Sequence, residues 1–464
     1  MMRSLGSWWQ HFKRLLSPPQ TICLGFLATI AICALLLLLP FSTASGQWNQ
    51  PLVALFTATS AVCVTGLAVV DTGSFFSPFG QFVILVAIQI GGLGYMTATS
   101  FLLLLVGRQF SLRDHMTMEE ALGSTVGNGG MWRLVLSIVG MTLLFEGLGA
   151  FVLAQTLVAE QGAWAGSWSA LFHSVSAFNN AGFSLFSDSL ESLSDNVAVM
   201  STISILIILG GFGYGVILEF YHWLHRSTLE RHQDKRENFS LNFKIVTLMT
   251  VVLLVLGMLA FLATESDNPG TIGRMPWSQK VLGAWFQSVT ARTAGFNSFD
   301  QASLEASSLL LMMIFMFVGA SPGGTGGGVK TTTLGTLLSC MKSALRGEES
   351  VRLFQRRVPD VLVRKAVGIL MGSAIMVAIA TMGLAVFDGD RFTFLELVFE
   401  AVSAYATVGL SIVGTPNLSP MSHLVLIPTM YCGRVGILLL VGALLGRSSP
   451  KKLVRYPEET FLIG

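Results

Sequence analysis

The stretch FTATSAVCVTGL, residues 56–67, decides the fold because it occurs three more times in altered form. The later copies are FHSVSAFNNAGF (172–183), FQSVTARTAGF (286–296) and FEAVSAYATVGL (399–410). Each copy has Phe, three residues, Ser or Thr and then Ala, and it closes on Gly followed by a large apolar residue. The four glycines, Gly66, Gly182, Gly295 and Gly409, are 116, 113 and 114 residues apart. Self-similarity at a fixed period indicates one structural unit that is present four times.

The composition places these copies in a membrane protein. Of 464 residues, 52% are hydrophobic and only 12% are charged, whereas soluble domains carry about 25% charged residues. The formal net charge of +2 gives no reason to expect a nucleic-acid partner. The cysteines form no CxxC pair and lie in or beside apolar runs, so we expect buried thiols and no disulfide. They are Cys23, Cys33, Cys63, Cys340 and Cys432.

Eight apolar runs are long enough to cross a bilayer, which needs about 20 residues per helix. The sixth run is interrupted by GASPGGTGGGVKTTT, residues 319–333. The sequence therefore predicts an all-α polytopic membrane protein with eight transmembrane helices. Each of its four units is expected to contain a helix, a re-entrant pore helix, a filter strand and a second helix. The apolar runs are approximately 21–41, 79–106, 131–159, 197–221, 243–263, 307–341, 366–387 and 421–446.

Lysine and arginine predict the orientation, because they remain in the cytoplasmic segments of membrane proteins. Of the 28 basic residues, 20 lie in the N-terminal arm, in three alternate connections and in the C-terminal tail. We therefore expect a multi-pass protein of the plasma (inner) membrane with both termini cytoplasmic. Its predicted parts are an amphipathic arm (1–20), repeat 1 (21–106), repeat 2 (131–224), repeat 3 with a broken second helix (239–345), repeat 4 (364–446) and a tail (447–464).

Each copy of the motif is expected to place non-helical backbone at membrane depth. Such backbone is tolerated there only where it lines a cavity or is buried in protein. Glycine can turn its carbonyl toward an axis, and the preceding helix ends with a partial negative charge. Four such strands around one axis would hold a dehydrated monovalent cation. The predicted filter residues are Val64, Thr65, Gly66, Asn180, Ala181, Gly182, Thr293, Ala294, Gly295, Thr407, Val408 and Gly409.

With these motifs, the chain resembles the membrane pore subunit of the Trk/Ktr/HKT superfamily of potassium transporters, and within it the Ktr (KtrB-like) type. TVGL at 407–410 is similar to the Thr-Val-Gly core of potassium-channel filters, whereas VTGL, NAGF and TAGF are looser versions. The resemblance covers about residues 20–450. It implies four channel-like units fused with pseudo-fourfold symmetry, a homodimer in membrane lipid, and a cytosolic nucleotide-binding regulatory ring as partner.

The same resemblance implies potassium uptake, with potassium ions bound at the filter residues and no organic cofactor. Gly66 favours potassium, because plant members that pass sodium commonly carry Ser at the first filter position. The third copy is one residue shorter before its glycine, and Asn180 and Ala181 replace Thr-Val in the second. We therefore expect fewer ion sites than in a tetrameric channel. A sodium-selective or sodium-coupled transporter on the same fold is the alternative.

The interruption of the sixth run predicts an intramembrane gating loop below the filter. It is not a phosphate-binding loop, because Val329 separates Gly328 from Lys330. Arg434 lies in the last run, where a charge is costly and indicates a functional site. A positive constriction that acts with the loop is favoured over a tether to backbone carbonyls, and both can hold together. The predicted gating residues are Gly319, Ser321, Gly323, Gly324, Thr325, Gly326, Gly327, Gly328, Lys330 and Arg434.

Other ionisable residues lie near the filter strands or in the spans. Three acids follow their filter glycines by five or six residues and could concentrate cations at the pore mouth; they are Asp71, Asp188 and Asp300. Three further residues are expected to make structural hydrogen bonds; they are Glu146, Arg292 and Glu400.

Two residues invite other functions that the sequence does not favour. His173 has no second histidine in a suitable span, so packing is favoured over a metal or ammonium site. Ser321 lies in the glycine-rich break, but a hydrolase would also need a base, and no histidine occupies a credible neighbouring span. The chain is therefore not expected to be an enzyme.

Overall fold

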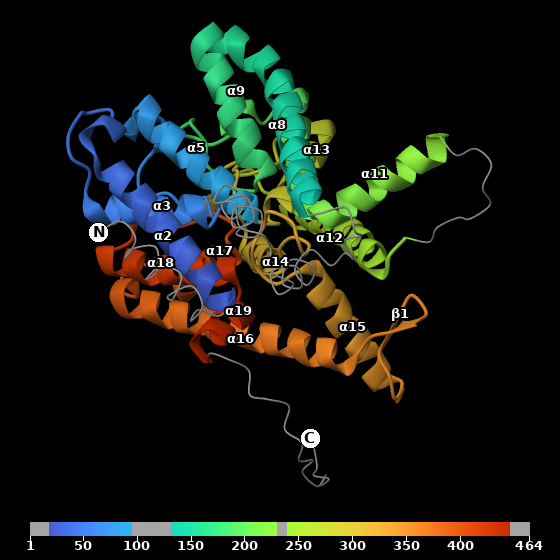
Figure 1. The fold of residues 1–464 in the computed structure, drawn as a ribbon. Helices are drawn as coiled ribbons and strands as arrows, with labels where there is room; N and C mark the ends of the chain where they lie inside the picture. The colour runs from blue at the N-terminus through green and yellow to red at the C-terminus, as the bar shows by residue number, and fades with distance from the viewer. Residues whose placement is uncertain (1–17, 95–130, 230–238, 446–464) are drawn as a thin grey trace, which may run out of the picture.

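The computed structural model describes residues 18–94, 131–229 and 239–445, and these residues fold into a helical body (Figure 1). One two-stranded hairpin, β1 (Arg352–Leu353) with β2 (Arg356–Arg357), interrupts the described helices between α15 and α16. The longer helices are α2 (Pro18–Leu38), α3 (Pro51–Val62), α5 (Pro78–Gly92), α8 (Met131–Gln161), α9 (Ala163–Phe178), α10 (Val197–Phe212), α11 (Tyr214–Leu229), α12 (Leu241–Glu265), α13 (Trp277–Thr290), α14 (Ala306–Phe317), α15 (Thr331–Leu345), α16 (Asp360–Asp388), α17 (Phe394–Ala406), α18 (Pro420–Val435) and α19 (Ile437–Leu445).

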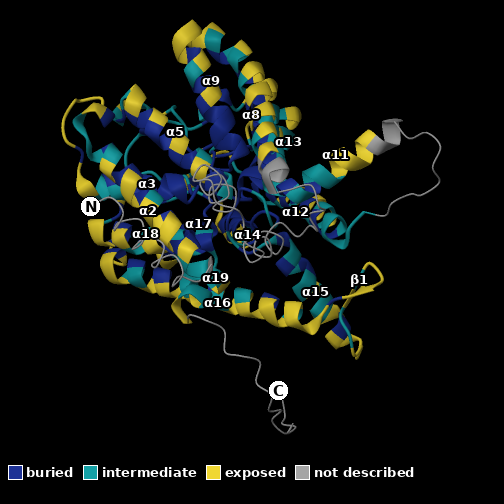
Figure 2. Cartoon of the chain, viewed as in Figure 1, coloured by how far each residue is buried: buried dark blue, intermediate teal, exposed yellow. Residues whose placement is uncertain are grey.

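Four of the described helices, α2, α8, α12 and α16, are long and apolar enough to cross a membrane. Figure 2 shows many exposed residues along α2, α8 and α16, and many of them are large and apolar, such as Leu143 and Ile379. Water would disfavour such a surface, whereas lipid tails are its natural solvent. The chain is therefore a polytopic helical membrane protein.

Two of the predicted continuous runs are sharply bent. Helix α10 turns by 99° into α11, and α18 turns by 95° into α19. The breaks fall at Gly213, with φ of 89°, and at Gly436, with φ of 87°. This left-handed conformation costs other residues about 1–2 kcal/mol, so glycine permits the turn. With each bent pair taken as one span, the described helices supply up to six spans by length and composition.

Parts of the predicted organisation lie outside the described residues. The N-terminal arm is described only from Pro18, the run 79–106 only as far as Gly94, and the tail 447–464 not at all. Helices α3, α5 and α14 are apolar but shorter, with 12, 15 and 12 residues. The interruption predicted in the sixth run separates α14 from α15.

Local signals in the sequence explain where several helices begin. Pro51, Pro78 and Pro420 occupy the first helical position of α3, α5 and α18, where the fixed φ of proline suits a helix and its missing N–H costs nothing. Helix α17 starts with a capping box, in which Thr393 and Glu396 each accept from the other's backbone N–H. These local signals set where the four helices begin.

The short helices α3, α9, α13 and α17 lie in the interior, each packed against the long helix that precedes it in the chain. The phenylalanine that opens each copy of the motif is completely buried in its short helix. These residues are Phe56, Phe172, Phe286 and Phe399, each 0% exposed. Burying an aromatic side chain stabilises the fold by about 1.5–3 kcal/mol, so the repeated Phe anchors each short helix in the core.

Candidate functional site

The four strands that follow the short helices share one backbone conformation. Two residues before each glycine the chain is left-handed, with φ of 56° at Val64, 57° at Asn180, 68° at Thr293 and 52° at Thr407. The glycines are also at positive φ, with 87°, 69°, 78° and 96° in chain order, and the residue between has a negative φ. When residues of positive and negative φ alternate, successive backbone groups of the same type point to the same side of the strand. Non-glycine residues adopt this conformation at a cost, and such strain gathers at functional sites.

The N–H groups of these strands are bonded back to the short helices. Thr65 donates to the Ser60 carbonyl at 2.8 Å, and Ala181 donates to the Ser176 carbonyl at 2.8 Å. Val408 and Ala294 likewise donate to Ser403 and Thr290, at 2.9 and 3.0 Å. The repeated Ser or Thr thus holds the strand that follows it. Within the described ranges, no hydrogen bond ends on a carbonyl of the twelve predicted filter residues.

The four glycines meet in a closed ring, each against a carbonyl of the next strand. A Cβ added at Gly66 would lie 2.5 Å from the Ala181 carbonyl oxygen, and one at Gly182 would lie 2.8 Å from that of Ala294. A Cβ at Gly295 would overlap the Val408 carbonyl, and one at Gly409 would overlap the Thr65 carbonyl. Residues from four distant parts of the chain are therefore in mutual contact. Any side chain at these positions would displace a carbonyl.

Two threonine hydroxyls of the strands are buried without a partner. Thr65 and Thr407 are both 0% exposed, and neither Oγ1 has a hydrogen-bond partner in the structure. Leaving a buried polar oxygen unsatisfied costs about 1–3 kcal/mol. Together with the unbonded carbonyls, these hydroxyls give the ring a surplus of oxygen acceptors. A cation that has lost its water could satisfy them.

The loop between α14 and α15 lies directly against two of these strands. A Cβ at Gly326 would overlap the Thr293 hydroxyl, and one at Gly327 would overlap the Thr407 hydroxyl. Only glycine leaves room for this approach. The predicted loop therefore contacts two of the four predicted filter strands directly.

The loop is anchored at the break of α10, which sequence reasoning did not foresee. Ser321 and Thr325 donate their backbone N–H groups to the carbonyls of Gly211 and Gly210, both at 3.0 Å. The Thr325 hydroxyl also donates to the Phe178 carbonyl at 3.2 Å, at the end of α9. The only signal in the sequence was the glycine pair in LGGFG (209–213), at the end of α10. The carbonyls of these two glycines are the ones that accept from the loop.

Two basic side chains hold the same loop. Arg434 on α18 donates to the Thr325 carbonyl and to the Gly91 carbonyl of α5. Lys330 donates through Nζ to the Gly326 carbonyl at 2.5 Å. Arg434 therefore contacts the loop through a backbone carbonyl and not through a side-chain hydroxyl. The Ser321 hydroxyl accepts a hydrogen bond from the Thr331 hydroxyl at 3.0 Å. Hydrogen bonds from a charged donor are the strong ones, so the loop is firmly tied.

Three polar residues beside the strands make hydrogen bonds, which were expected for Arg292 and Glu400, whereas packing was expected for His173. The Arg292 Nη2 donates to the Gly319 carbonyl at 3.4 Å. Glu400 accepts from the Ser411 hydroxyl. His173 donates from Nδ1 to the Ser169 carbonyl at 2.7 Å, and its Nε2 lies 2.9 Å from the Ser184 hydroxyl. Each of the last two ties a short helix to the chain that leaves its filter strand.

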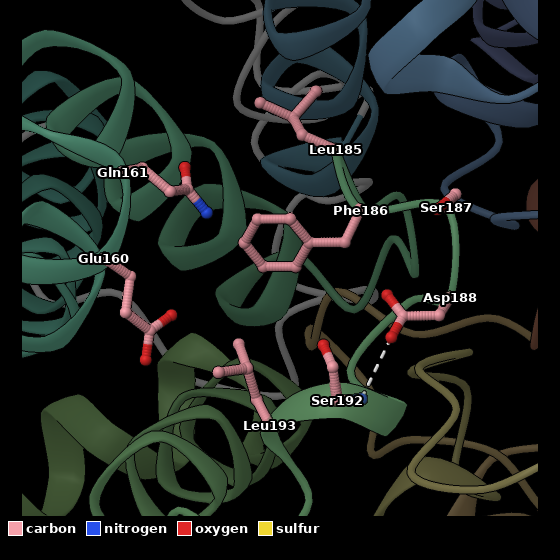
Figure 3. A pocket seen from close by; sticks show the side chains of 8 residues that line it. All are labelled: Glu160, Gln161, Leu185, Phe186, Ser187, Asp188, Ser192 and Leu193. Carbon is pink, nitrogen blue, oxygen red and sulfur yellow. Dashed lines mark hydrogen bonds between the residues drawn. The ribbon is translucent and has the colours of Figure 1, made fainter.

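The predicted pore-mouth acids form short-range caps. Asp71 accepts from the Ser74 N–H at 2.7 Å, and Asp188 accepts from the Ser192 N–H at 3.0 Å. Asp300 accepts from the Ala302 N–H at 3.0 Å. Figure 3 shows Asp188 beside a cavity of about 320 Å³. That cavity is lined by Glu160, Gln161, Leu185, Phe186, Ser187, Asp188, Ser192 and Leu193.

Charge accumulates near this cavity. Burial raises the pKa of Glu191, and the neighbouring Asp300 and Asp188 carboxylates raise it further. Like charges disfavour ionisation, and the shift shows that Asp188 and Glu191, after the second strand, lie near Asp300, after the third. The sequence alone could not show that acids from these two segments meet.

The chain matches the model of the TrkH family, described as a cation transport protein, over residues 9–445. It is 36% identical over 449 residues to Ktr system potassium uptake protein B of Bacillus subtilis, covering 97% of both chains. It is 39% identical over 447 residues to the Vibrio alginolyticus protein of the same name, covering 96% of this chain and 95% of that one. It is also 36% identical over 458 residues to potassium/sodium uptake protein NtpJ of Enterococcus hirae, covering 98% and 99%.

The fold is similar to a solved structure. The crystal structure of the potassium transporter TrkH from Vibrio parahaemolyticus superposes with a TM-score of 0.66, covering 90% of this chain and 84% of the other at 18% identity. The family match spans nearly the whole described helical body and includes all four strands of the glycine ring. By sequence and by fold, this chain belongs to the TrkH family of cation transport proteins.

Proposed function

We propose that the protein takes up potassium across the plasma membrane as the membrane subunit of a Trk/Ktr-type system, through a central pore whose filter is the glycine ring. The closed contact of Gly66, Gly182, Gly295 and Gly409 with each other's strands carries this proposal. Unbonded carbonyls around one point can replace the water of a monovalent cation. The names of the relatives, two potassium uptake proteins and one potassium/sodium uptake protein, support potassium as the cargo.

In this proposal, four units surround the pore in pseudo-fourfold order, each with a long helix, a short pore helix, a filter strand and a second helix. Their bounds are those predicted as repeats, and the protein crosses the membrane eight times with both termini cytoplasmic. The four strands share their left-handed residue and their glycine, which supports this arrangement. Potassium binds at the twelve filter residues, and the acids at the outer ends of the second and third units attract cations.

The loop between α14 and α15 acts as the gate in this proposal. It lies against Thr293 and Thr407 on the inner side of the ring, so an ion leaving the filter would meet it. Arg434 holds it in place and contributes a positive charge to the constriction. Displacement of the loop would open the path without changing the filter.

The protein is proposed to work as a homodimer with a cytosolic nucleotide-binding ring. The β1–β2 hairpin presents three exposed arginines, Arg352, Arg356 and Arg357, beyond the end of α15 (Figure 1). Exposed basic residues suit an acidic protein surface. Movement of α15, which begins where the loop ends, would carry the signal to the gate. The relatives named as parts of a Ktr system support further components.

Replacement of Gly66 by Ser tests the filter. The new Cβ would lie 2.5 Å from the Ala181 carbonyl oxygen, so that carbonyl must move and the potassium-to-sodium flux ratio is expected to fall. Gly46→Ser is the matched control, because Gly46 is also at positive φ (69°) but has no atom within 4 Å of the added Cβ. Both fluxes are measured in vesicles containing each variant. An unchanged ratio in Gly66→Ser would show that the glycine ring is not the filter. If the wild-type protein itself prefers sodium, the alternative of a sodium transporter is favoured.

A further inference from the structure

A buried carboxylate lies beside the second filter strand, and neither the filter nor the gate uses it. Glu146 is midway along α8 and is only 3% exposed. A carboxyl group at the middle of a span is costly to bury, so it bonds to a partner, and it is a functional-site hypothesis by default. Within the described residues, it forms no ion pair. Its partners must therefore be neutral donors.

Both carboxylate oxygens of Glu146 accept from side-chain amides of other helices. Asn179 Nδ2 donates to Oε1 at 2.8 Å, and Gln89 Nε2 donates to Oε2 at 3.1 Å. Asn179 Nδ2 also lies 2.8 Å from Gln89 Oε1, so the three side chains form a closed triangle. The triangle joins α8, the end of α9 and α5.

The triangle is attached to the filter through Asn179. This residue caps α9 and directly precedes Asn180, the left-handed residue of the second strand. The next residue, Ala181, supplies the carbonyl that meets Gly66 in the ring. A shift of Asn179 would therefore be passed within two residues to a carbonyl of the ring.

The surrounding chain is shaped for this contact. A Cβ at Gly92 of α5 would overlap Asn179 Oδ1, so only glycine leaves room for the amide. The positions that precede the left-handed residue in the other three strands hold Cys63, Arg292 and Ala406. Of these, Arg292 donates to the Gly319 carbonyl of the loop. The carboxylate–amide arrangement is therefore particular to the second strand, which lacks the threonine of TVGL.

We propose that Glu146 is a positioning residue for cation selectivity, which acts by holding Asn179 through its carboxylate and thereby fixes the Ala181 carbonyl in the ring. This inference rests on the proposed filter. The two oxygens of the Glu146 side chain let it accept from two amides of different helices at once. This arrangement is suited to hold a strand that is strained by its left-handed residue.

The test compares potassium and sodium fluxes in vesicles containing the full-length protein. Glu146→Ala is expected to lower the potassium-to-sodium ratio by up to about tenfold, the upper end of what one intramolecular hydrogen bond contributes. Asn179→Ala should lower it similarly, and the double variant should be no worse than either, because both remove one interaction. Gln155→Ala is the control, since Gln155 is on the same helix but exposed.

The outcomes separate a positioning role from a merely structural one. Glu146→Gln keeps one acceptor oxygen and should retain more of the ratio than Glu146→Ala; the reverse order would contradict the proposal. Equal loss of both fluxes at an unchanged ratio would overturn it, because Glu146 would then only support folding. If Gly66→Ser lowers the ratio and Glu146→Ala does not, the role of Glu146 is refuted but the proposed filter stands. If Gly66→Ser also leaves the ratio unchanged, the filter itself is misassigned.

Discussion

Replacement of Arg434 by Ala tests how the loop is held. The guanidinium makes two hydrogen bonds, but only the one to the Thr325 carbonyl reaches the loop. The other joins α18 to Gly91 of α5 and should persist when the loop moves. One hydrogen bond to a charged group is worth about 1.5–3 kcal/mol. Its loss should shift the equilibrium toward the displaced loop about 10- to 150-fold.

Other contacts limit the effect. Thr325 keeps its bonds to the Gly210 and Phe178 carbonyls in the variant, so the loop is loosened and not released. Potassium flux should rise, and its dependence on the regulatory partner should weaken. Stopped-flow or tracer uptake into vesicles, with equal amounts of folded protein, measures both.

A second variant separates the hydrogen bond from the charge. Arg434→Gln removes the charge but keeps an amide donor for the Thr325 carbonyl, so its flux should lie between those of wild type and Arg434→Ala. If Gln and Ala raise flux equally, the positive charge is the barrier and the bond is incidental. Wild-type flux and regulation in Arg434→Ala would refute the gate while leaving the filter untouched.

Three further changes have expected outcomes. Removal of residues 324–327 deletes Thr325, the loop residue that Arg434 grips, and should raise flux as much as Arg434→Ala or more; tracer uptake that stays at the wild-type level would contradict this. Neutralising the exposed Arg352, Arg356 and Arg357 together should reduce co-purification of the regulatory subunit. Unchanged co-purification would mean that these charges only set the orientation of the chain in the membrane. Because burial, Asp300 and Asp188 raise the pKa of Glu191, it takes up a proton at a higher pH than an ordinary glutamate. Glu191→Gln should therefore flatten the dependence of flux on pH in the range above the ordinary glutamate pKa of about 4.3, and an unaltered profile would exclude Glu191 as the titrating group.

The repeated motif, the apolar runs and the interrupting glycines could all be read from the sequence, because each is a local signal. The repeat predicts a short helix before each glycine, and the structure has these helices as α3, α9, α13 and α17. The structure adds that all four phenylalanines are fully buried and that all four Ser or Thr carbonyls hold the strand that follows. Glycine at positive φ was likewise predictable at the filter, where the chain must leave a helix abruptly.

Helix continuity was not predictable from hydropathy. The runs 197–221 and 421–446 look continuous, yet Gly213 and Gly436 bend them by 99° and 95°. An isolated glycine is tolerated within a helix, so its presence alone does not predict a break. In the first bend, the freed backbone finds partners in the loop, where Tyr214 donates to the Gly323 carbonyl at 3.2 Å. Only the tertiary structure supplies such partners.

The pairings that build the site also depend on packing. Arg434 meets a carbonyl 343 residues away on α5 and another 109 residues away in the loop. Asn179 meets Gln89 and Glu146 on two other helices. The sequence determined which groups were costly to bury, because charge and polarity belong to single residues. The tertiary structure decided which donor satisfies which acceptor, because that depends on how the helices pack.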